Sequence, residues 1–283
     1  MAGFKTNIIT SSSSTGGRTL LEEATSFYFN SDGNDTTGDG TEARPWATFQ
    51  GAIDNVALLY DCGGNAVTFN PEAETHVLTS QINLKPLLAC QSAVIAGVEG
   101  TVLDVSSCSS LFAITNSQTS TAWTINAFSQ TYTGDTSSVR GVSSTQGANT
   151  TVGSIKTKPC QSGRVLSASK FGSLKLSTSV KIDEGTATST SLLESIDHGY
   201  MDVQSATIDF QSATLNFNNA FIFYCLRGGS MYAPNLVCSN FANVSNIRKY
   251  SVSYGGAFLR ESSVTYPTQA AAGVTAGVYD IQS

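Results

Sequence analysis

Charged side chains are scarce in this chain of 283 residues, where they make up 13% of the sequence and leave a net charge of −6. A nucleic-acid groove needs clustered lysine and arginine to neutralise phosphates, so this balance argues against nucleic-acid binding. No apolar run approaches the roughly 18–20 residues that span a bilayer, and residues 1–25 lack the apolar core of a secretory signal peptide. We therefore expect a protein made in a cytoplasm, without membrane insertion.

Histidine and cysteine are few and widely spaced. The only histidines are His76 and His198, and no CxxC or other close cysteine grouping is present, so neither a zinc site nor any other cofactor is expected. The six cysteines stand at long intervals, at Cys62, Cys90, Cys108, Cys160, Cys225 and Cys238. They are either buried free thiols or partners in disulfides formed after release from the cell, including disulfides between subunits. The sequence leaves both interpretations open.

Apolar residues nevertheless reach 40%, and Ser, Thr, Asn and Gly dominate what remains. Disordered chains combine low hydrophobicity with high net charge, and this chain does not. Abundant β-branched and hydroxyl residues with little charge are typical of long sheets whose outer faces carry short polar side chains. The composition therefore favours a strand-rich protein with a sizeable core.

A single helix is predicted, beginning at Pro45, because proline suits the first helical turn, where its missing N–H costs nothing. The apolar residues that follow recur at spacings of three and four and form one stripe: Trp46, Phe49, Ile53, Val56 and Tyr60. The run Cys62–Gly64 ends this helix.

Short strands are predicted after the helix, each bounded by polar residues or glycine. They cover Ala66–Phe69, His76–Leu78, Gln81–Leu84, Ala93–Ala96, Thr101–Val105, Leu111–Thr115 and Trp123–Phe128. Residues 129–163 are rich in Ser, Thr and Gly, and there the sequence leaves open either a loop-like insertion or irregular coils.

The second half of the chain contains an internal repeat. Four segments start with glycine and place an apolar residue two positions later, at Gly172, Gly199, Gly229 and Gly256, which are 27, 30 and 27 residues apart. A second strand follows in each unit, at Val180–Ile182, Ile208–Phe210, Val237–Cys238 and Val264–Tyr266. Periods of this length indicate a solenoid, and the fixed Leu and Asn positions of leucine-rich repeats are missing. The repeat predicts a right-handed, single-stranded parallel β-helix.

In-register stacking of these coils predicts neighbours across them. Lys175 and Asp202 are expected to point outward on adjacent coils, about 4.8 Å apart by strand spacing. An exposed ion pair contributes only about 0–1 kcal/mol, so we interpret this position as a solvated face rather than a catalytic site.

The stretch Phe27–Asp54 carries a specific pattern: an aromatic strand ending in Asn30, a loop rich in Gly, Asp and Asn over residues 32–40, and the run Pro45–Asp54. This pattern resembles the opening of phage tail-fibre and tailspike β-helix domains of the pectate-lyase-like fold. Phe49 departs from the isoleucine that is more usual there, and Glu74–His76 replaces a Gly-Thr-Tyr sequence. The segment Gly273–Tyr279 is similar to short tails that close such domains.

The resemblance implies a virion protein of the tail or neck, a homotrimer with a helical cap over the end of the β-helix. It further implies a virion-attachment segment over residues 1–25 that contacts other virion proteins, a capping unit over 26–64 and a β-helix over 65–283. Host attachment, with a surface glycan as a candidate partner, is the function that follows. Two alternatives stay open: a polysaccharide-degrading tailspike, and a capsid decoration or collar protein.

No catalytic residues are predicted. Glycoside hydrolysis needs two carboxyl groups roughly 5–10 Å apart beside a sugar site. The acidic residues in strand-like positions are few, and no dense aromatic and acidic cluster accompanies them: Asp104, Asp183, Glu184, Asp202 and Asp209. We therefore expect a structural protein rather than an enzyme.

Three other features have structural interpretations. The loop Asp32–Gly40 suggests calcium only superficially, because Ala43 stands where an EF-hand needs its twelfth-position Glu, so a turn is predicted. Trp123 and the run Phe221–Tyr224 are predicted to be core. His198 directly precedes a repeat glycine, and a turn between strands explains it.

Overall fold

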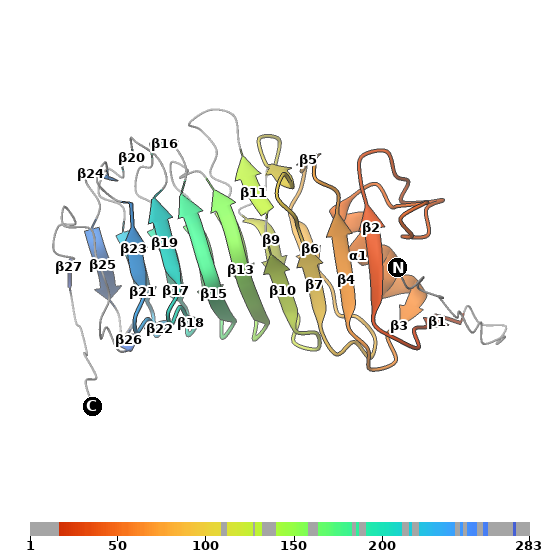
Figure 1. Ribbon diagram of the computed structural model, residues 1–283. Helices are drawn as coiled ribbons and strands as arrows, with labels where there is room; N and C mark the ends of the chain where they lie inside the picture. The colour runs from red at the N-terminus through yellow and green to blue at the C-terminus, as the bar shows by residue number, and fades with distance from the viewer. Residues whose placement is uncertain are drawn as a thin grey trace.

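Parallel strand pairing between successive turns of the chain builds the molecule. The computed structural model describes residues 17–108, 112–126, 128–131, 140–157, 164–182, 185–186, 191–210, 215–216, 221–240, 244–245, 248–253, 257–259 and 274–275. Every pairing between strands in this part is parallel, and the strands lie side by side from the N-terminal to the C-terminal end (Figure 1). The chain is thus an all-β parallel solenoid, which confirms the predicted fold class.

The largest sheet has 14 strands. Its main path runs through β2 (Thr25–Phe29), β4 (Val67–Pro71), β7 (Ala93–Ala96), β10 (Trp123–Asn126), β13 (Asn149–Thr157), β15 (Ser173–Ile182), β18 (Tyr200–Asp202), β22 (Ser230–Tyr232) and β26 (Ala257–Leu259). Five further strands pair off this path: β5 (Thr75–Val77), β8 (Val102–Asp104), β11 (Phe128–Thr131), β19 (Thr207–Phe210) and β23 (Val237–Ser239). The long strand β15 pairs with β18 through its first half and with β19 through its second.

The other sheets complete the coils. An eight-stranded sheet contains β6 (Ile82–Leu84), β9 (Phe112–Asn116), β12 (Arg140–Ser144), β14 (Arg164–Ser169), β17 (Ser191–Ile196), β21 (Phe221–Leu226), β25 (Arg248–Ser253) and β27 (Val274–Thr275). A three-stranded sheet contains β16 (Gly185–Thr186), β20 (Leu215–Asn216) and β24 (Val244–Ser245). At the N-terminal end, β1 (Thr19–Leu20) pairs with β3 (Tyr60–Asp61).

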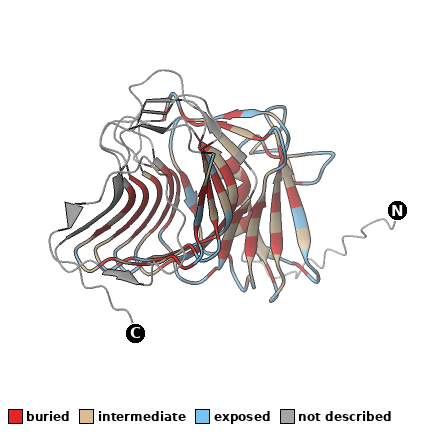
Figure 2. Ribbon diagram, turned by 60° about the vertical axis from the view of Figure 1, so that its left-hand side comes forward, coloured by how far each residue is buried: buried red, intermediate tan, exposed pale blue. Residues whose placement is uncertain are grey.

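Apolar side chains at equivalent positions of successive coils stack into continuous rows. In the largest sheet the register joins Phe69, Ile95, Ile125, Val152 and Leu176, all of them buried. In the eight-stranded sheet it joins Ile82, Ile114, Val142, Leu166, Leu193 and Phe223, which are also buried. Buried positions alternate along strands of the largest sheet such as β4 and β7, whereas β14 and β17 in the eight-stranded sheet are buried along most of their length (Figure 2).

The glycine repeat is confirmed as the period of the solenoid. The residues two positions after the repeat glycines, Leu174, Met201, Met231 and Phe258, are register partners in turn. Lys175 and Asp202 are register partners as well, as predicted. The second strands of the first three units fall in β15, β19 and β23. Gly256 and Val264–Tyr266 lie outside the described residues.

The helix α1 (Phe49–Leu59) begins four residues later than predicted. Pro45 and Trp46 belong instead to an extended segment, in which Trp46 forms a parallel bridge with Phe29. The helix begins where Thr48, in an extended conformation, accepts a hydrogen bond from the Gly51 N–H at 2.9 Å. Trp46 is fully buried, so its apolar character is explained by the core and not by a helical stripe.

The predicted strands of the first half are present with ends shifted by a few residues. Only Ala93–Ala96 has identical bounds, and Trp123–Phe128 is interrupted, since β10 ends at Asn126 and β11 starts at Phe128. Within residues 129–163, β12 joins the eight-stranded sheet and β13 joins the largest one. The described part of that segment therefore contributes strands to both sheets.

The described start of the chain lies against the first coil. Residues 1–16 are outside the described part, but β1 pairs with β3, and Leu21 N donates to Asp61 O at 2.8 Å. Helix α1 lies at this same end, beside β2, β3 and β6 (Figure 1). Most of the cysteines are free thiols: Cys62, Cys90, Cys108, Cys225 and Cys238. Cys160 and most of Gly273–Tyr279 lie outside the described residues.

Candidate functional site

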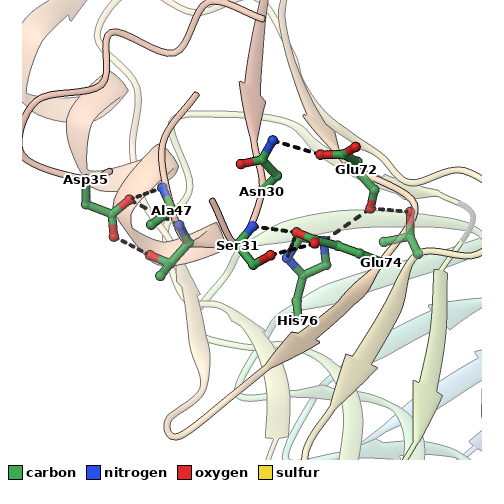
Figure 3. A network of polar contacts seen from close by, with 9 residues as sticks. Asn30, Ser31, Asp35, Ala47, Glu72, Glu74 and His76 are labelled. Carbon is green, nitrogen blue, oxygen red and sulfur yellow. Dashed lines mark hydrogen bonds and ion pairs between the residues drawn. The ribbon is translucent and has the colours of Figure 1, made fainter. Parts of the chain in front are cut away.

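A network of polar contacts joins the first loop to the second coil (Figure 3). Asn30 Nδ2 donates to Glu72 Oε2 at 2.7 Å. Glu74 accepts two hydrogen bonds from Ser31, one from its N–H at 2.5 Å and one from its hydroxyl at 2.7 Å. We call these residues, together with His76, the loop–coil junction.

His76 occupies the interior of the loop–coil junction. Its Nε2 lies 3.2 Å from Glu72 O and its Nδ1 3.8 Å from Glu74 Oε1. The ring packs edge-on against Phe49, with ring centroids 4.9 Å apart. It is tilted against Phe29, with centroids 5.7 Å apart. Two carboxylates and an imidazole are a set used in acid–base catalysis. Here His76 is only 7% exposed and both Glu74 oxygens accept from Ser31, so the junction is arranged to hold the loop in place.

Asp35 holds the start of α1. Its Oδ1 accepts from the Ala47 N–H at 2.8 Å and the Thr48 N–H at 3.1 Å, and its Oδ2 accepts from the Thr48 hydroxyl at 2.7 Å. A carboxylate at this end of a helix is favoured by the helix dipole. A Cβ at Gly51 would lie 2.1 Å from the Asp35 carboxyl carbon, so only glycine leaves room for this contact. The loop Asp32–Gly40 is therefore part of the helix's N-terminal support.

The same two-residue turn recurs on four successive coils, beginning at Gln146–Gly147, and on the last three of them it carries charged or aromatic side chains. These three turn pairs are Lys170–Phe171, Asp197–His198 and Arg227–Gly228, and all six residues have a positive φ between 48° and 75°. The turns are hydrogen-bonded across coils, since His198 N donates to Arg227 O at 3.1 Å and Phe171 N to Asp197 O at 3.4 Å. We call these three stacked turns the turn ladder.

The turn ladder presents aromatic and charged groups to solvent. The rings of Phe171 and His198 stack with centroids 5.1 Å apart and planes within 7°, although Phe171 is 72% exposed. Arg227 donates two hydrogen bonds to the Asp197 carboxylate, one of them at 3.1 Å from Nη2. The Arg227 hydrogen bond lowers the pKa of Asp197, and the charge of Lys170 acts in the same direction.

The outer face of the adjacent strands continues this surface. Tyr200 lies two residues after His198, and Asp202 and Tyr232 are register partners beside it. Partial burial raises the pKa of the Tyr200 hydroxyl, and the neighbouring Asp202 and Tyr232 raise this pKa further. Exposed rings flanked by ionic groups are suited to contacts with sugars or with another protein. Sequence reasoning identified His198 only as a turn residue, because the stacking partner Phe171 lies one coil away.

The described acidic residues among those considered for catalysis, Asp104, Asp202 and Asp209, each make local contacts within their own coil or with the next one. Asp104 accepts from the Ser106 N–H at 2.9 Å and Asp202 from the Gln204 N–H at 3.1 Å, so both shape local turns. Asp209 accepts from the side chains of Ser239 and Asn240 on the next coil, at 3.2 and 2.6 Å. Asp183 and Glu184 lie outside the described residues. Trp123, Ile222 and Phe223 are buried, which confirms the core prediction for these residues, whereas Tyr224 is only partly buried.

A buried ion pair that the sequence did not indicate crosses two coils of the eight-stranded sheet. Glu194 is 1% exposed and accepts from Arg164 Nε at 2.5 Å and from the Ser167 hydroxyl at 2.9 Å. The Arg164 guanidinium also lies over the Tyr224 ring, 5.6 Å from its centroid. A buried carboxylate needs such partners, since an isolated charge in a core is very costly.

Among the described residues, no group of three or more His, Cys, Asp or Glu side chains could hold a metal ion. No helix in the described ranges is long and apolar enough to cross a membrane. The chain matches no protein-family profile, no curated protein and no solved structure.

Proposed function

We propose that this chain is a structural and adhesive component of a phage virion, a trimeric β-helical fibre or spike of the tail or neck that takes part in host attachment. The observation that carries the proposal is a parallel solenoid that opens with the loop–helix unit of residues 27–59. The fold is compatible with a fibre or spike. The opening unit adds the resemblance of Phe27–Asp54 to phage tail-fibre and tailspike domains, which is more specific than the fold alone.

The residues that carry the resemblance make specific contacts in that unit. Asp35 binds the backbone at the start of α1, Thr48 caps the helix, and Gly51 leaves space for the carboxylate. The aromatic strand of this motif is β2, which pairs with β4 of the second coil, so that Phe27 is the register partner of Phe69. These residues work as one assembly, which supports reading the motif as a structural module.

In this proposal, α1 is the cap of the solenoid. An uncovered coil end would expose unpaired strand edges and apolar core to water. Phe49, Ala52, Ile53 and Val56 on α1 are buried in the core at the N-terminal end, and the loop–coil junction fastens the preceding loop to the second coil. Residues 1–25 would then lead from the capped end to other virion proteins.

A structural role accounts for the polar groups better than a catalytic one. The carboxylates of Glu74, Asp35 and Glu194 each accept hydrogen bonds from neighbouring loops or strands. The turn ladder is the surface we assign to host contact, with a cell-surface glycan as its partner. Its exposed Phe171 ring and the Asp197–Arg227 pair offer a stacking face beside charged hydrogen-bonding groups.

Two measurements test the proposal. Light scattering of the purified full-length protein should give three times the 29.7 kDa chain mass, and antibody labelling should place the protein on the tail or neck of a phage particle. A monomer in solution that is absent from particles would refute it. Labelling on the capsid surface or collar would assign the chain to the decoration alternative. Release of reducing ends or unsaturated products from host polysaccharide would assign it to a depolymerase.

A further inference from the structure

Two cysteines meet where the first two coils stack. Cys62 follows β3, and Cys90 precedes β7. The backbones of these turns are hydrogen-bonded, with Cys62 N donating to Leu88 O at 2.9 Å and Gly64 N donating to Ala89 O at 2.7 Å. The strands that follow begin as register partners, Val67 opposite Ala93. The two cysteines are therefore held on adjacent coils.

Their side chains belong to the same packed region, Cys62 fully buried and Cys90 partly exposed. The Cys90 thiol donates to Ser92 O at 3.2 Å. The interaction between the two neighbouring thiols raises the pKa of Cys62, as does burial. The same interaction lowers the pKa of Cys90, and so does the hydrogen bond to Ser92 O, against the opposing effect of burial. Cys90 is thus the more readily ionised thiol and the one that solvent can reach. By contrast, burial raises the pKa of Cys225 and of Cys238 to about 12.

We propose that Cys62 and Cys90 are a redox-active pair that closes into a disulfide between the first two coils. The Cys90 thiolate attacks a small-molecule disulfide such as oxidised glutathione, which forms a mixed disulfide and releases one glutathione thiolate. Cys62 then gives up its proton and attacks the Cys90 sulfur, which releases the second glutathione. Two protein thiols are oxidised and one glutathione disulfide is reduced to two thiols.

The bond would fasten the turn that holds the start of the chain. Asn65 Nδ2 donates to Leu21 O at 2.9 Å, and Arg18 Nη1 donates to Tyr60 O at 3.2 Å, so residues 18–21 lie against this turn. A disulfide between Cys62 and Cys90 would close residues 62–90 into a loop and so lower the conformational entropy of the unfolded chain. We expect the melting temperature to rise by about 5–10 °C on oxidation. This inference does not depend on the virion role.

The test uses the reduced full-length protein, treated with oxidised glutathione and then blocked with N-ethylmaleimide. Intact mass should show two fewer blocked thiols, and peptide mapping should show one linkage, Cys62 to Cys90. Before oxidation, Cys90 should react with iodoacetamide at least tenfold faster than Cys225 or Cys238. A persistent glutathione adduct at Cys90, linkage to another cysteine, or no loss of thiols would each overturn the proposal.

Matched variants distinguish the attacking thiol, Cys90, from the resolving thiol, Cys62. Cys62→Ser should leave Cys90 as a stable mixed disulfide carrying one glutathione, because the resolving thiol is gone. Cys108→Ser should behave as the wild type, since Cys108 takes no part in the pair. If Cys62→Ser does not fold, mapping of the wild type still decides between the linked and unlinked forms.

Discussion

At the scale of single residues, the repeat positions require glycine because the backbone of the preceding coil leaves no space for a Cβ. Gly199 follows the Asp197–His198 turn and donates from its N–H to Ile196 O at 2.9 Å. A Cβ built on Gly199 would lie 2.2 Å from Ala168 O, which belongs to the preceding coil. The corresponding distance at Gly229 is 2.1 Å, to Ser195 O. Glycine recurs because the coils approach through their backbones at this point.

We predict that Gly199→Ala destabilises the protein by about 3 kcal/mol, the upper end of the usual cost of overpacking, because the backbone carbonyl it meets cannot rotate away. Thermal and chemical unfolding of the purified variant measure this loss. Gly64→Ala is the matched control. Its Cβ would meet nothing within 4 Å, and it carries only the cost of a positive φ, about 1 kcal/mol. Equal losses in the two variants would contradict the steric explanation.

Spaced glycines are visible in a sequence, and that is why the repeat and the strand register could be predicted. The turn ladder could not. Phe171 and His198 occupy positive φ values that sequence statistics assign to glycine or asparagine, and their stacking joins residues 27 positions apart. Their contact follows only once the register of the coils is known, because neither residue has a helical or strand-like spacing to its partner.

At the scale of elements, α1 shows how a local pattern can mislead. Trp46, Phe49 and Ile53 have helical spacing, yet Trp46 is buried from an extended segment whose backbone bonds to Tyr28 and Asn30. Asp35 binds Ala47 and the N-cap residue Thr48, which directly precede the helix. The periodicity correctly indicated a helix, but its N-cap Thr48 is held by a carboxylate 13 residues earlier, beyond the reach of a local pattern.

The buried carboxylate of Glu194 and its partner Arg164 join the neighbouring strands β17 and β14. We predict that Glu194→Gln destabilises the protein by about 3 kcal/mol, because Arg164 keeps its charge without a carboxylate partner. Removing one partner of a buried ion pair usually costs about 3–5 kcal/mol. We expect the low end of this range because the Arg164 side chain is 22% exposed and can reach water. Denaturant midpoints of wild type and variant measure the change.

Two controls separate charge from packing at this pair. The double variant Arg164→Met with Glu194→Leu should recover most of the stability, because an apolar pair of similar volume replaces the charges. Arg227→Gln removes a partner from the exposed pair of the turn ladder and should leave the unfolding midpoint unchanged. If Glu194→Gln is as stable as wild type, the buried pair is not a determinant of this sheet.

At the scale of the whole molecule, each coil contacts mainly its neighbours in the stack. In such one-dimensional architectures, stability is roughly the sum of coil terms and nearest-neighbour interfaces. The core near the N-terminal end is an aromatic row in which Phe69 lies 6.3 Å from Phe27 and 5.6 Å from Trp123 between ring centroids. Trp123 is two strands away from β4, and the small Ala93 on the intervening strand leaves space for this contact.

Phe69→Ala should therefore destabilise one end of the solenoid. We expect a local loss of about 3–5 kcal/mol, the usual cost of removing a buried phenylalanine ring. Amide hydrogen exchange should become faster in peptides covering β2, β4, β7 and β10 and stay unchanged in β17 and β21. Phe171→Ala, which removes an exposed ring from the turn ladder, should change exchange in neither group. Faster exchange throughout the molecule after Phe69→Ala would show that the coils unfold as one cooperative unit, and the nearest-neighbour description would then be wrong.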